Sequence, residues 1–222
     1  MESIQQVIVQ LDKEIHDFEI PLFRGAVNAV MERGHSILYH NHQNDGYRYS
    51  YPLIQYKRIN RKAAIVCIGK GVDAIVEFLS VQTSILKIGQ RTEEFTIESV
   101  QAEEQLTGID NRMYSYNIAN WLPFNSRNHT EFKSLCGLVA QIQMLECILI
   151  GNILAFLKGI DVFVEDRIEL FITHISEPKV VNHKGLSLIS YDVDFKSNIL
   201  LPNYIGLGKD SSIGHGVVVM NA

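Results

Sequence analysis

The sequence predicts an α+β protein built from two tandem ferredoxin-like domains, the second of them degenerate. Three observations predict it. The length of 222 residues corresponds to between one and two ordinary domains. About the first hundred residues follow the order strand, helix, strand, strand, helix, strand, which is the split βαββαβ unit. The second half combines one long helical segment with several strands, and we place the domains at residues 1–108 and 109–222.

The elements of the first half follow from apolar periodicity and from turn residues. Residues 4–11 are β-branched and partly alternating, which predicts a strand. Residues 21–34 carry apolar side chains at helical spacing between Pro21, which suits a first helical turn, and Gly34, which suits a helix end. The remaining elements are strands over 47–59 and 62–69 joined by a hairpin turn, a helix over 72–81, and strands over 84–89 and 92–101.

The second half begins with a predicted strand over 113–121. One helix is expected from about Thr130 to Leu157, because apolar residues recur there at steps of three or four. Strands over 164–175 and 184–199, a glycine-rich loop and a last strand over 217–220 follow. No sequence repeat links the two halves, so the second copy is expected to be degenerate.

Composition excludes several classes of protein. The formal net charge of −5 gives no support to a general polyanion binder, so a nucleic-acid site would have to be a local basic patch. The three cysteines form no CxxC pair, which fits a reducing cytosol and argues against a structural zinc site. The N-terminus does not resemble a signal peptide.

The longest apolar stretch runs from Ile142 to Leu157 and contains Glu146 and Asn152. It has about 16 residues, whereas a spanning helix needs about 20. We therefore expect a buried helix, no membrane contact and a cytoplasmic location.

The first unusual segment covers residues 35–62 and is rich in histidine, tyrosine and basic side chains. Tyrosine rings stack on bases, basic side chains contact phosphates, and histidine transfers protons near neutral pH. An RNA-cleaving site without metal would combine these residue types, although a tyrosine-rich edge hairpin would have the same composition. The basic residues are Arg48, Lys57, Arg58, Arg61 and Lys62.

His40 and His42 lie one residue apart, so in an extended segment they share a face and could converge on one phosphate or one metal ion. A metal site would need further ligands. His35 and Asp45 are the candidates, but no metal-binding motif frames them. We therefore expect no metal and no other cofactor.

The second unusual segment is the glycine-rich loop of residues 206–216, GLGKDSSIGHG. Its glycines let backbone N–H groups approach a phosphate, and Lys209 adds positive charge. It is not a Walker loop, because no GK[ST] ends a GxxxxG spacing. It is not a dinucleotide-binding fingerprint either, because a strand and not a helix follows it. Taken alone, the loop could equally be a plain turn.

Together the two segments resemble a known family. The C-terminal GLGKDSSIGHGVV is similar to the glycine-rich loop of the repeat-associated RNA-binding superfamily of CRISPR systems. LFRGAVNAV, YHNH, YRYSYPLIQYK and KGVDAIVEFL resemble the branch that processes CRISPR repeat RNA. This resemblance implies a pair of ferredoxin-like folds. It also implies metal-independent cleavage of the precursor RNA, in which the 2′-hydroxyl attacks the adjacent phosphate and leaves a 2′,3′-cyclic phosphate.

The resemblance also implies roles for particular residues. His40 or His42 would act as acid or base, and Tyr39, Tyr47 and Tyr49 would position or stack on the RNA. Gly206, Gly208, Gly214 and Gly216 carry over as the RNA-contacting loop. From chemistry alone we add Lys209 and His215 as RNA contacts, and Lys57 or Arg58 as the positive charge that stabilises the phosphorane.

Two other functions stay open at this point: a non-catalytic RNA-binding subunit of the same superfamily, and a ferredoxin-like module that binds a small molecule or a protein. The acidic isoelectric point near 5.9 favours the last of these. The expected partner is CRISPR precursor RNA. A homodimer would supply the surface that one short chain lacks.

Overall fold

The computed structural model describes residues 1–31, 42–43, 46–47, 51–80, 85–183 and 185–221. The chain divides into two compact units. The N-terminal unit contains Ser3–Gln105 and Ser212–Gly214, and the C-terminal unit contains Met1–Glu2, Leu106–Ser211 and His215–Ala222. The predicted domain limits of 1–108 and 109–222 stay a prediction. The observed division differs from them in assigning Ser212–Gly214 to the N-terminal unit, and Met1–Glu2 and residues 106–108 to the C-terminal unit.

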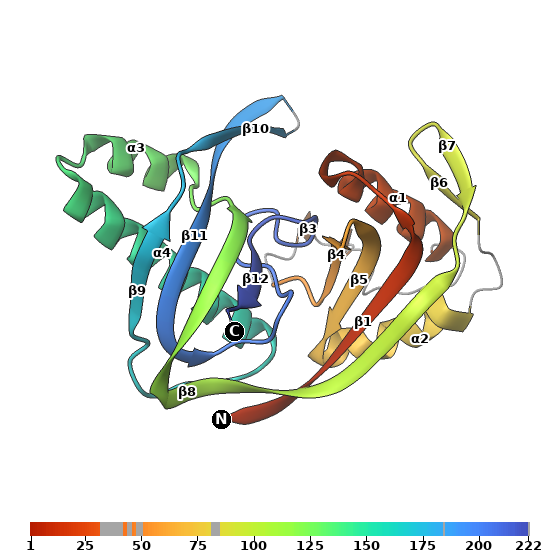
Figure 1. Ribbon diagram of the computed structural model, residues 1–222, viewed down its shortest axis with the longest axis horizontal. Helices are drawn as coiled ribbons and strands as arrows, with labels where there is room; N and C mark the ends of the chain where they lie inside the picture. Colours follow the sequence, from red (N-terminus) through yellow and green to blue (C-terminus); the bar gives the residue numbers. More distant parts are fainter. Residues whose placement is uncertain (32–41, 44–45, 48–50, 81–84, 184, 222) are drawn as a thin grey trace. The chain divides into compact units, whose positions relative to one another are not determined.

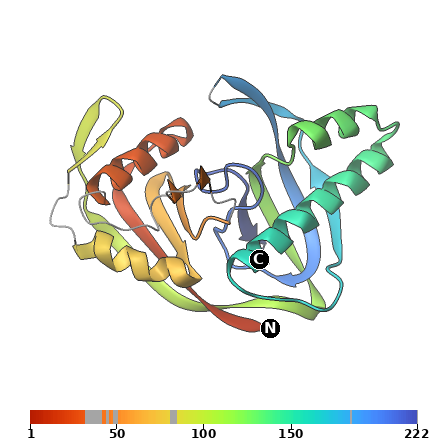
Figure 2. The same ribbon diagram turned by 180° about the vertical axis from the view of Figure 1, so that it is seen from behind.

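The N-terminal unit has the predicted βαββαβ order. Its sheet has the strand order β8-β1-β5-β4, and β5 is antiparallel to both of its neighbours. Figures 1 and 2 show helices α1 and α2 on the same face of this sheet. The elements are β1 (Glu2–Glu14), α1 (Ile20–Met31), β4 (Ile54–Ile59), β5 (Lys62–Ile68), α2 (Val72–Ser80) and the first part of β8 (Ile97–Trp121).

Smaller elements complete this unit. They are the 3-10 turns Asp17–Glu19 and Gly69–Gly71, the two-residue strands β2 (His42–Gln43) and β3 (Gly46–Tyr47), and the hairpin β6 (Ile85–Ile88) and β7 (Arg91–Glu94). The predicted strand over 84–89 therefore corresponds to a separate two-stranded hairpin and does not join the main sheet. The predicted turn between β4 and β5 is confirmed. Asn60 and Arg61 have φ angles of 49° and 70°, as a two-residue hairpin turn requires.

The apolar core of the N-terminal unit lies between the sheet and its two helices. Phe23 of α1 meets Tyr56 of β4 edge to face, with 5.7 Å between the ring centroids. The Tyr56 hydroxyl donates to Asn28 Oδ1 at 3.0 Å, so the one polar atom of this buried ring is satisfied. Ile213 belongs to the same core.

The C-terminal unit consists of a second antiparallel sheet and two helices. Strand β11 pairs with β8, β9 and β10, and β12 pairs with β8. Helix α4 lies across one face of this sheet (Figure 2) and buries Leu145, Leu149, Ile153, Phe156 and Leu157. The elements are the last part of β8, α3 (Ser126–Ser134), α4 (Leu138–Gly159), β9 (Leu170–Ile175), β10 (Lys179–His183), β11 (Leu186–Leu200) and β12 (Val217–Met220).

The prediction of one helix from Thr130 to Leu157 is wrong, because two helices occupy this region. Asn125 caps α3 by accepting a hydrogen bond from the Asn128 amide, so that helix begins at Ser126. Leu135 is extended and ends α3, and Gly137 has a φ of 93° at the start of α4. A positive φ breaks a helix even where the apolar spacing continues across it.

The expectation of a buried helix over residues 142–157 also needs correction. By length and composition α4 is the one described helix that could cross a membrane, with a mean hydropathy of 1.7 over its most apolar window. Only 17% of that window is buried. One side of α4 packs on the sheet, as in a folded amphipathic helix, and Leu138 and Val139 at its start are exposed.

Candidate functional site

The glycine-rich loop is a fixed structure and not a plain turn. Its two ends pair with each other, because the Leu207 amide donates to Gly216 O at 2.8 Å and the Val218 amide donates to Ile205 O at 2.8 Å. The loop is also tied to the end of β8. The Gly216 amide donates to Asn120 O at 3.1 Å, and the Lys209 amide donates to Leu122 O at 3.3 Å.

Two glycines allow this close packing. Gly216 has a φ of 61°, and a Cβ atom there would lie 1.9 Å from the Leu207 carbonyl oxygen. Gly208 has a φ of 87°, and a Cβ atom there would lie 2.9 Å from Trp121 Nε1, which donates to Asn152 Oδ1 at 3.0 Å. A side chain at either position would meet backbone or a hydrogen-bonded core group, so glycine is required at both.

The middle of the loop belongs to the N-terminal unit. Ser212 O accepts a hydrogen bond of 2.8 Å from the Tyr56 amide, and Ile213 forms a parallel bridge with Tyr56. This pairing covers the outer edge of β4, which would otherwise present unpaired backbone groups. Ser212 and Ile213 therefore have a structural role, and the predicted RNA contact of Gly214 stays a prediction. Lys209 is exposed and His215 is half-buried.

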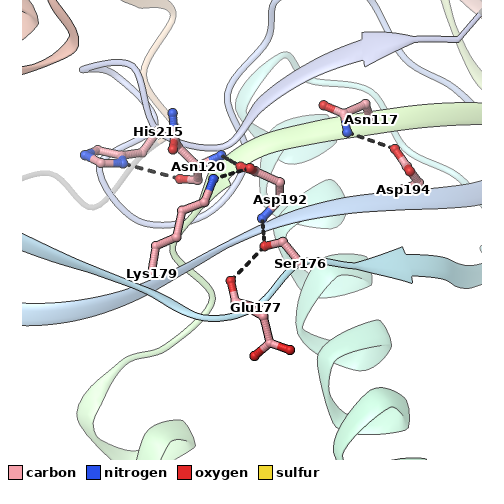
Figure 3. Close-up of polar contacts among 8 residues, drawn as sticks. All are labelled: Asn117, Asn120, Ser176, Glu177, Lys179, Asp192, Asp194 and His215. Atoms are coloured by element: carbon pink, nitrogen blue, oxygen red, sulfur yellow. Dashed lines mark hydrogen bonds and ion pairs between the residues drawn. The ribbon is translucent and has the colours of Figure 1, made fainter.

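His215 lies beside a network of polar side chains in the C-terminal unit (Figure 3). Its Nδ1 atom is 3.3 Å from the backbone carbonyl oxygen of Asn120, and the backbone N–H of Asn120 donates to Asp192 Oδ1 at 2.8 Å. Asp192 Oδ2 pairs with the Lys179 ammonium, and the Asp192 amide donates to Ser176 Oγ at 3.0 Å. Asn120 has a φ of 51°, which is uncommon for a residue other than glycine. The hydrogen bonds of its backbone N–H and carbonyl groups stabilise this conformation.

The carboxyl group of Asp192 is ionised in this network. Partial burial would raise its pKa, but the hydrogen bond from the Asn120 amide and the ammonium of Lys179 outweigh burial and place the pKa below its usual value of 3.8. The network therefore carries a fixed negative and a fixed positive charge beside the loop. His215 can donate or accept at such a place, depending on its tautomer.

The predicted basic residues Lys57 and Arg58 do not converge on one point. They are successive residues of β4, so their side chains leave opposite faces of the strand. Arg58 pairs with Asp17 at 3.4 Å. Lys57 has no exposed surface, and burial lowers its pKa to about 7. A phosphate in solvent could not reach Lys57 without rearrangement, so its predicted contact with RNA stays a prediction.

Three of the predicted catalytic and stacking residues, His40, Tyr39 and Tyr49, lie outside the described residues. For His42 and Tyr47 only the backbone is described, and they are opposite partners in the β2–β3 ladder. Among the residues that the structure describes, no group of three or more His, Cys, Asp and Glu side chains could hold a metal ion.

Sequence reasoning missed Asn120, Lys179 and Asp192. Asn120 and Asp192 lie in strand segments without a local motif, and only the pairing of β8 with β11 and β12 brings them to the loop. Lys179 begins β10, a strand that the sequence analysis did not predict.

Two family models together match nearly the whole chain. A family model described as the Cas6b N-terminal domain matches residues 2–106, and one described as the Cas6b C-terminal domain matches residues 108–220. An uncharacterized protein of Methanocaldococcus jannaschii is 34% identical over 113 residues, which are 50% of this chain and 76% of that protein.

Two solved structures are similar along their full length. One, described as Cas6b, has a TM-score of 0.89 and 22% sequence identity, and the match covers 99% of the present chain and 100% of the solved one. The other, described as the CRISPR RNA processing endoribonuclease Cas6b, has a TM-score of 0.75 and 20% identity with the same coverage. These likenesses establish the fold and confirm the predicted α+β class with two tandem ferredoxin-like domains.

Replacing Gly216 by alanine should destabilise the C-terminal unit. A non-glycine residue at this φ costs about 1–2 kcal/mol, and the clash with the Leu207 carbonyl adds to that. We expect the free energy of unfolding in urea to fall by at least about 2 kcal/mol. Gly151→Ala is the matched control: it lies in α4 with open space around it, so alanine should stabilise by about 0.5–1 kcal/mol. An unchanged midpoint for Gly216→Ala would contradict this account of the loop.

Replacing Lys57 by methionine should stabilise the protein in a pH-dependent way. Because the folded pKa is about 7 and the usual value is 10.5, the unfolded chain binds more protons between these two values. The penalty for burying Lys57 is therefore complete below pH 7, falls as the pH rises, and is lost above pH 10.5. Lys57→Met should gain a few kcal/mol at pH 7, on the order expected for such a shift, and about 1 kcal/mol or less at pH 10. Thermal unfolding across this range tests it, with exposed Lys87→Met as control. A gain independent of pH would show that the ammonium is not desolvated.

Proposed function

Because the chain belongs to the Cas6b family, we propose that it is a metal-independent endoribonuclease that cleaves CRISPR repeat RNA. The observation that carries the proposal is the match of both family models, which together cover residues 2–106 and 108–220. A similar solved structure is described as a CRISPR RNA processing endoribonuclease. The fixed glycine-rich loop, with exposed Lys209 and half-buried His215, supports an RNA-contacting role for this part of the chain.

The proposed reaction is an internal transesterification. A base removes the proton of a ribose 2′-hydroxyl, and the 2′-oxygen attacks the adjacent phosphorus. The bond from phosphorus to the 5′-oxygen breaks, and an acid protonates that oxygen. The products are a 2′,3′-cyclic phosphate and a 5′-hydroxyl, and no metal or redox partner is needed to balance the step.

His40 and His42 are the proposed base and acid in this reaction. Imidazole is the side chain whose ordinary pKa lies closest to neutral pH, so one histidine can be neutral while the other is protonated. Tyr39, Tyr47 and Tyr49 come from the same segment as proposed positioning or stacking residues. Arg58 is the better placed of the two proposed phosphorane-stabilising cations, because Lys57 is wholly buried.

The location and assembly follow from the proposed substrate. Precursor RNA is transcribed in the cytoplasm, which is the proposed location. A homodimer is proposed because one copy offers little surface for a long RNA, and mass measurement with and without RNA tests it.

The double variant His40→Ala/His42→Ala should lose cleavage and keep RNA binding. Each acid or base contributes on the order of 10²–10⁴-fold to the rate. The assay uses a labelled repeat RNA from the CRISPR array of the source organism, in EDTA, with detection of the 2′,3′-cyclic phosphate. His174→Ala is the matched control, since His174 is an exposed histidine of β9.

The outcomes separate the alternatives. Cleavage that survives the double substitution would remove both histidines from the chemistry. Tight, salt-sensitive binding by a wild-type protein that does not cleave would instead support the non-catalytic subunit. Absence of both binding and cleavage would support a module that does not act on RNA.

A further inference from the structure

A pocket of about 210 Å³ lies within the C-terminal unit, apart from the network around His215. Three segments line it: the connection after β8 with the start of α3, residues 186–189 at the start of β11, and Lys209 of the glycine-rich loop. Half of its ten lining residues are apolar, and the polar ones are Asn125, Ser126, His129, Ser187 and Lys209. This combination suits a ligand with one flat apolar part and one charged part.

The apolar wall of the pocket is packed against other aromatic rings. Phe124 is 9% exposed, and its ring lies 4.8 Å from the Phe132 ring and 6.3 Å from the Tyr191 ring, measured between centroids. The His129 ring lies 5.4 Å from Phe124 at an interplanar angle of 31°. A planar base could stack on such a wall without first ordering it.

His129 has an unmet hydrogen-bonding atom. Its Nε2 is shielded from solvent and has no partner among the described residues. The His129 amide is bonded to Asn125 O at 3.0 Å, so helix α3 holds the residue in place. A buried polar atom without a partner costs free energy, and a bound group with a donor or an acceptor would recover it.

Lys209 supplies positive charge at the same pocket. Its amide is tied to Leu122 O at 3.3 Å, so its backbone is held at the pocket while its side chain is exposed. The first turn of α3 forms another part of the lining through Asn125 and Ser126, and the positive end of the helix dipole is located there. The charged side of the pocket is therefore complementary to a phosphate.

We propose that this pocket binds one unpaired nucleotide of the RNA substrate. The base lies against Phe124, and Lys209 pairs with the phosphate. The His129 ring turns so that Nε2, which is shielded in the free protein, forms a hydrogen bond to the nucleotide. An inorganic anion would leave the apolar wall unused, and an apolar side chain would leave Nε2 and Lys209 unused. The inference rests on the proposed function, since it names the part of the RNA that this pocket takes.

The test is an abasic scan of the repeat RNA. Each nucleotide in turn is replaced by a ribose without a base, and binding is measured by titration on RNA with a 2′-deoxy substitution at any mapped cleavage site. Wild type should lose roughly 5- to 100-fold in affinity at one unpaired position, which is the range for one stacked base. Two variants alter the pocket. His129→Phe keeps an aromatic ring and removes Nε2, and Ser187→Phe fills the pocket. In both variants the abasic replacement should cause a much smaller loss of RNA affinity than in wild type.

Matched controls keep the outcomes distinct. Lys209→Ala should weaken binding of the intact RNA, whereas Lys133→Ala, an exposed lysine of α3 outside the pocket, should not. Circular dichroism and thermal unfolding confirm that each variant is folded. If the RNA binds but the pocket variants and the abasic replacement act independently, within about twofold, the inference is overturned and the proposed function stands. If wild type neither binds nor cleaves the RNA, the proposed function fails and the inference fails with it.

Discussion

The close approach of Gly216 to Leu207 is the constraint on which the C-terminal loop depends. Only a residue without Cβ lets the two ends of the loop pair through the Leu207 amide and Gly216 O. That pairing places the loop against Asn120 and Leu122 at the end of β8. The positions of Lys209 and His215 then follow from backbone hydrogen bonds and do not depend on long side chains. A loop held in this way can present functional groups with little loss of entropy on binding.

Side chains alternate between the two faces of β4, which explains why the neighbouring residues Tyr56 and Lys57 lie in different environments. Tyr56 faces the helices, where Phe23 and Asn28 satisfy its ring and its hydroxyl. Lys57 faces the other way and is buried, so its ammonium is desolvated and its pKa falls to about 7. A lysine that is neutral in part near physiological pH can accept as well as donate a proton. Lys57 is therefore a structural cost at neutral pH, unlike the solvated cations that contact RNA backbones.

Local chemistry made much of the fold predictable. The βαββαβ order of the first half followed from apolar periodicity, and the hairpin at Asn60 and Arg61 followed from turn residues. The break between α3 and α4 was missed because the apolar spacing continues past Leu135, although Gly137 was a signal for it. The pocket could not be predicted, since Phe124, Leu186 and Lys209 are far apart in sequence and only the fold brings them together. The same holds for Asn120 and Asp192, which meet through strand pairing.

The acidic net charge and an RNA substrate are compatible because charge acts locally. The screening length at physiological salt is about 8 Å, so distant carboxylates contribute little at a site. Two carboxylates of the acidic segment 92–104 are also paired. Glu98 pairs with Lys62, and Glu93 pairs with Arg91, which also pairs with the buried Glu19. Lys209 has no ion-pair partner among the described residues and lies at a pocket whose lining is half apolar. Recognition would then depend on one shaped pocket and a fixed loop, with fewer phosphate contacts than a basic protein would use. Recognition by a pocket and a loop, with few phosphate contacts, favours discrimination between RNA sequences over general affinity for RNA.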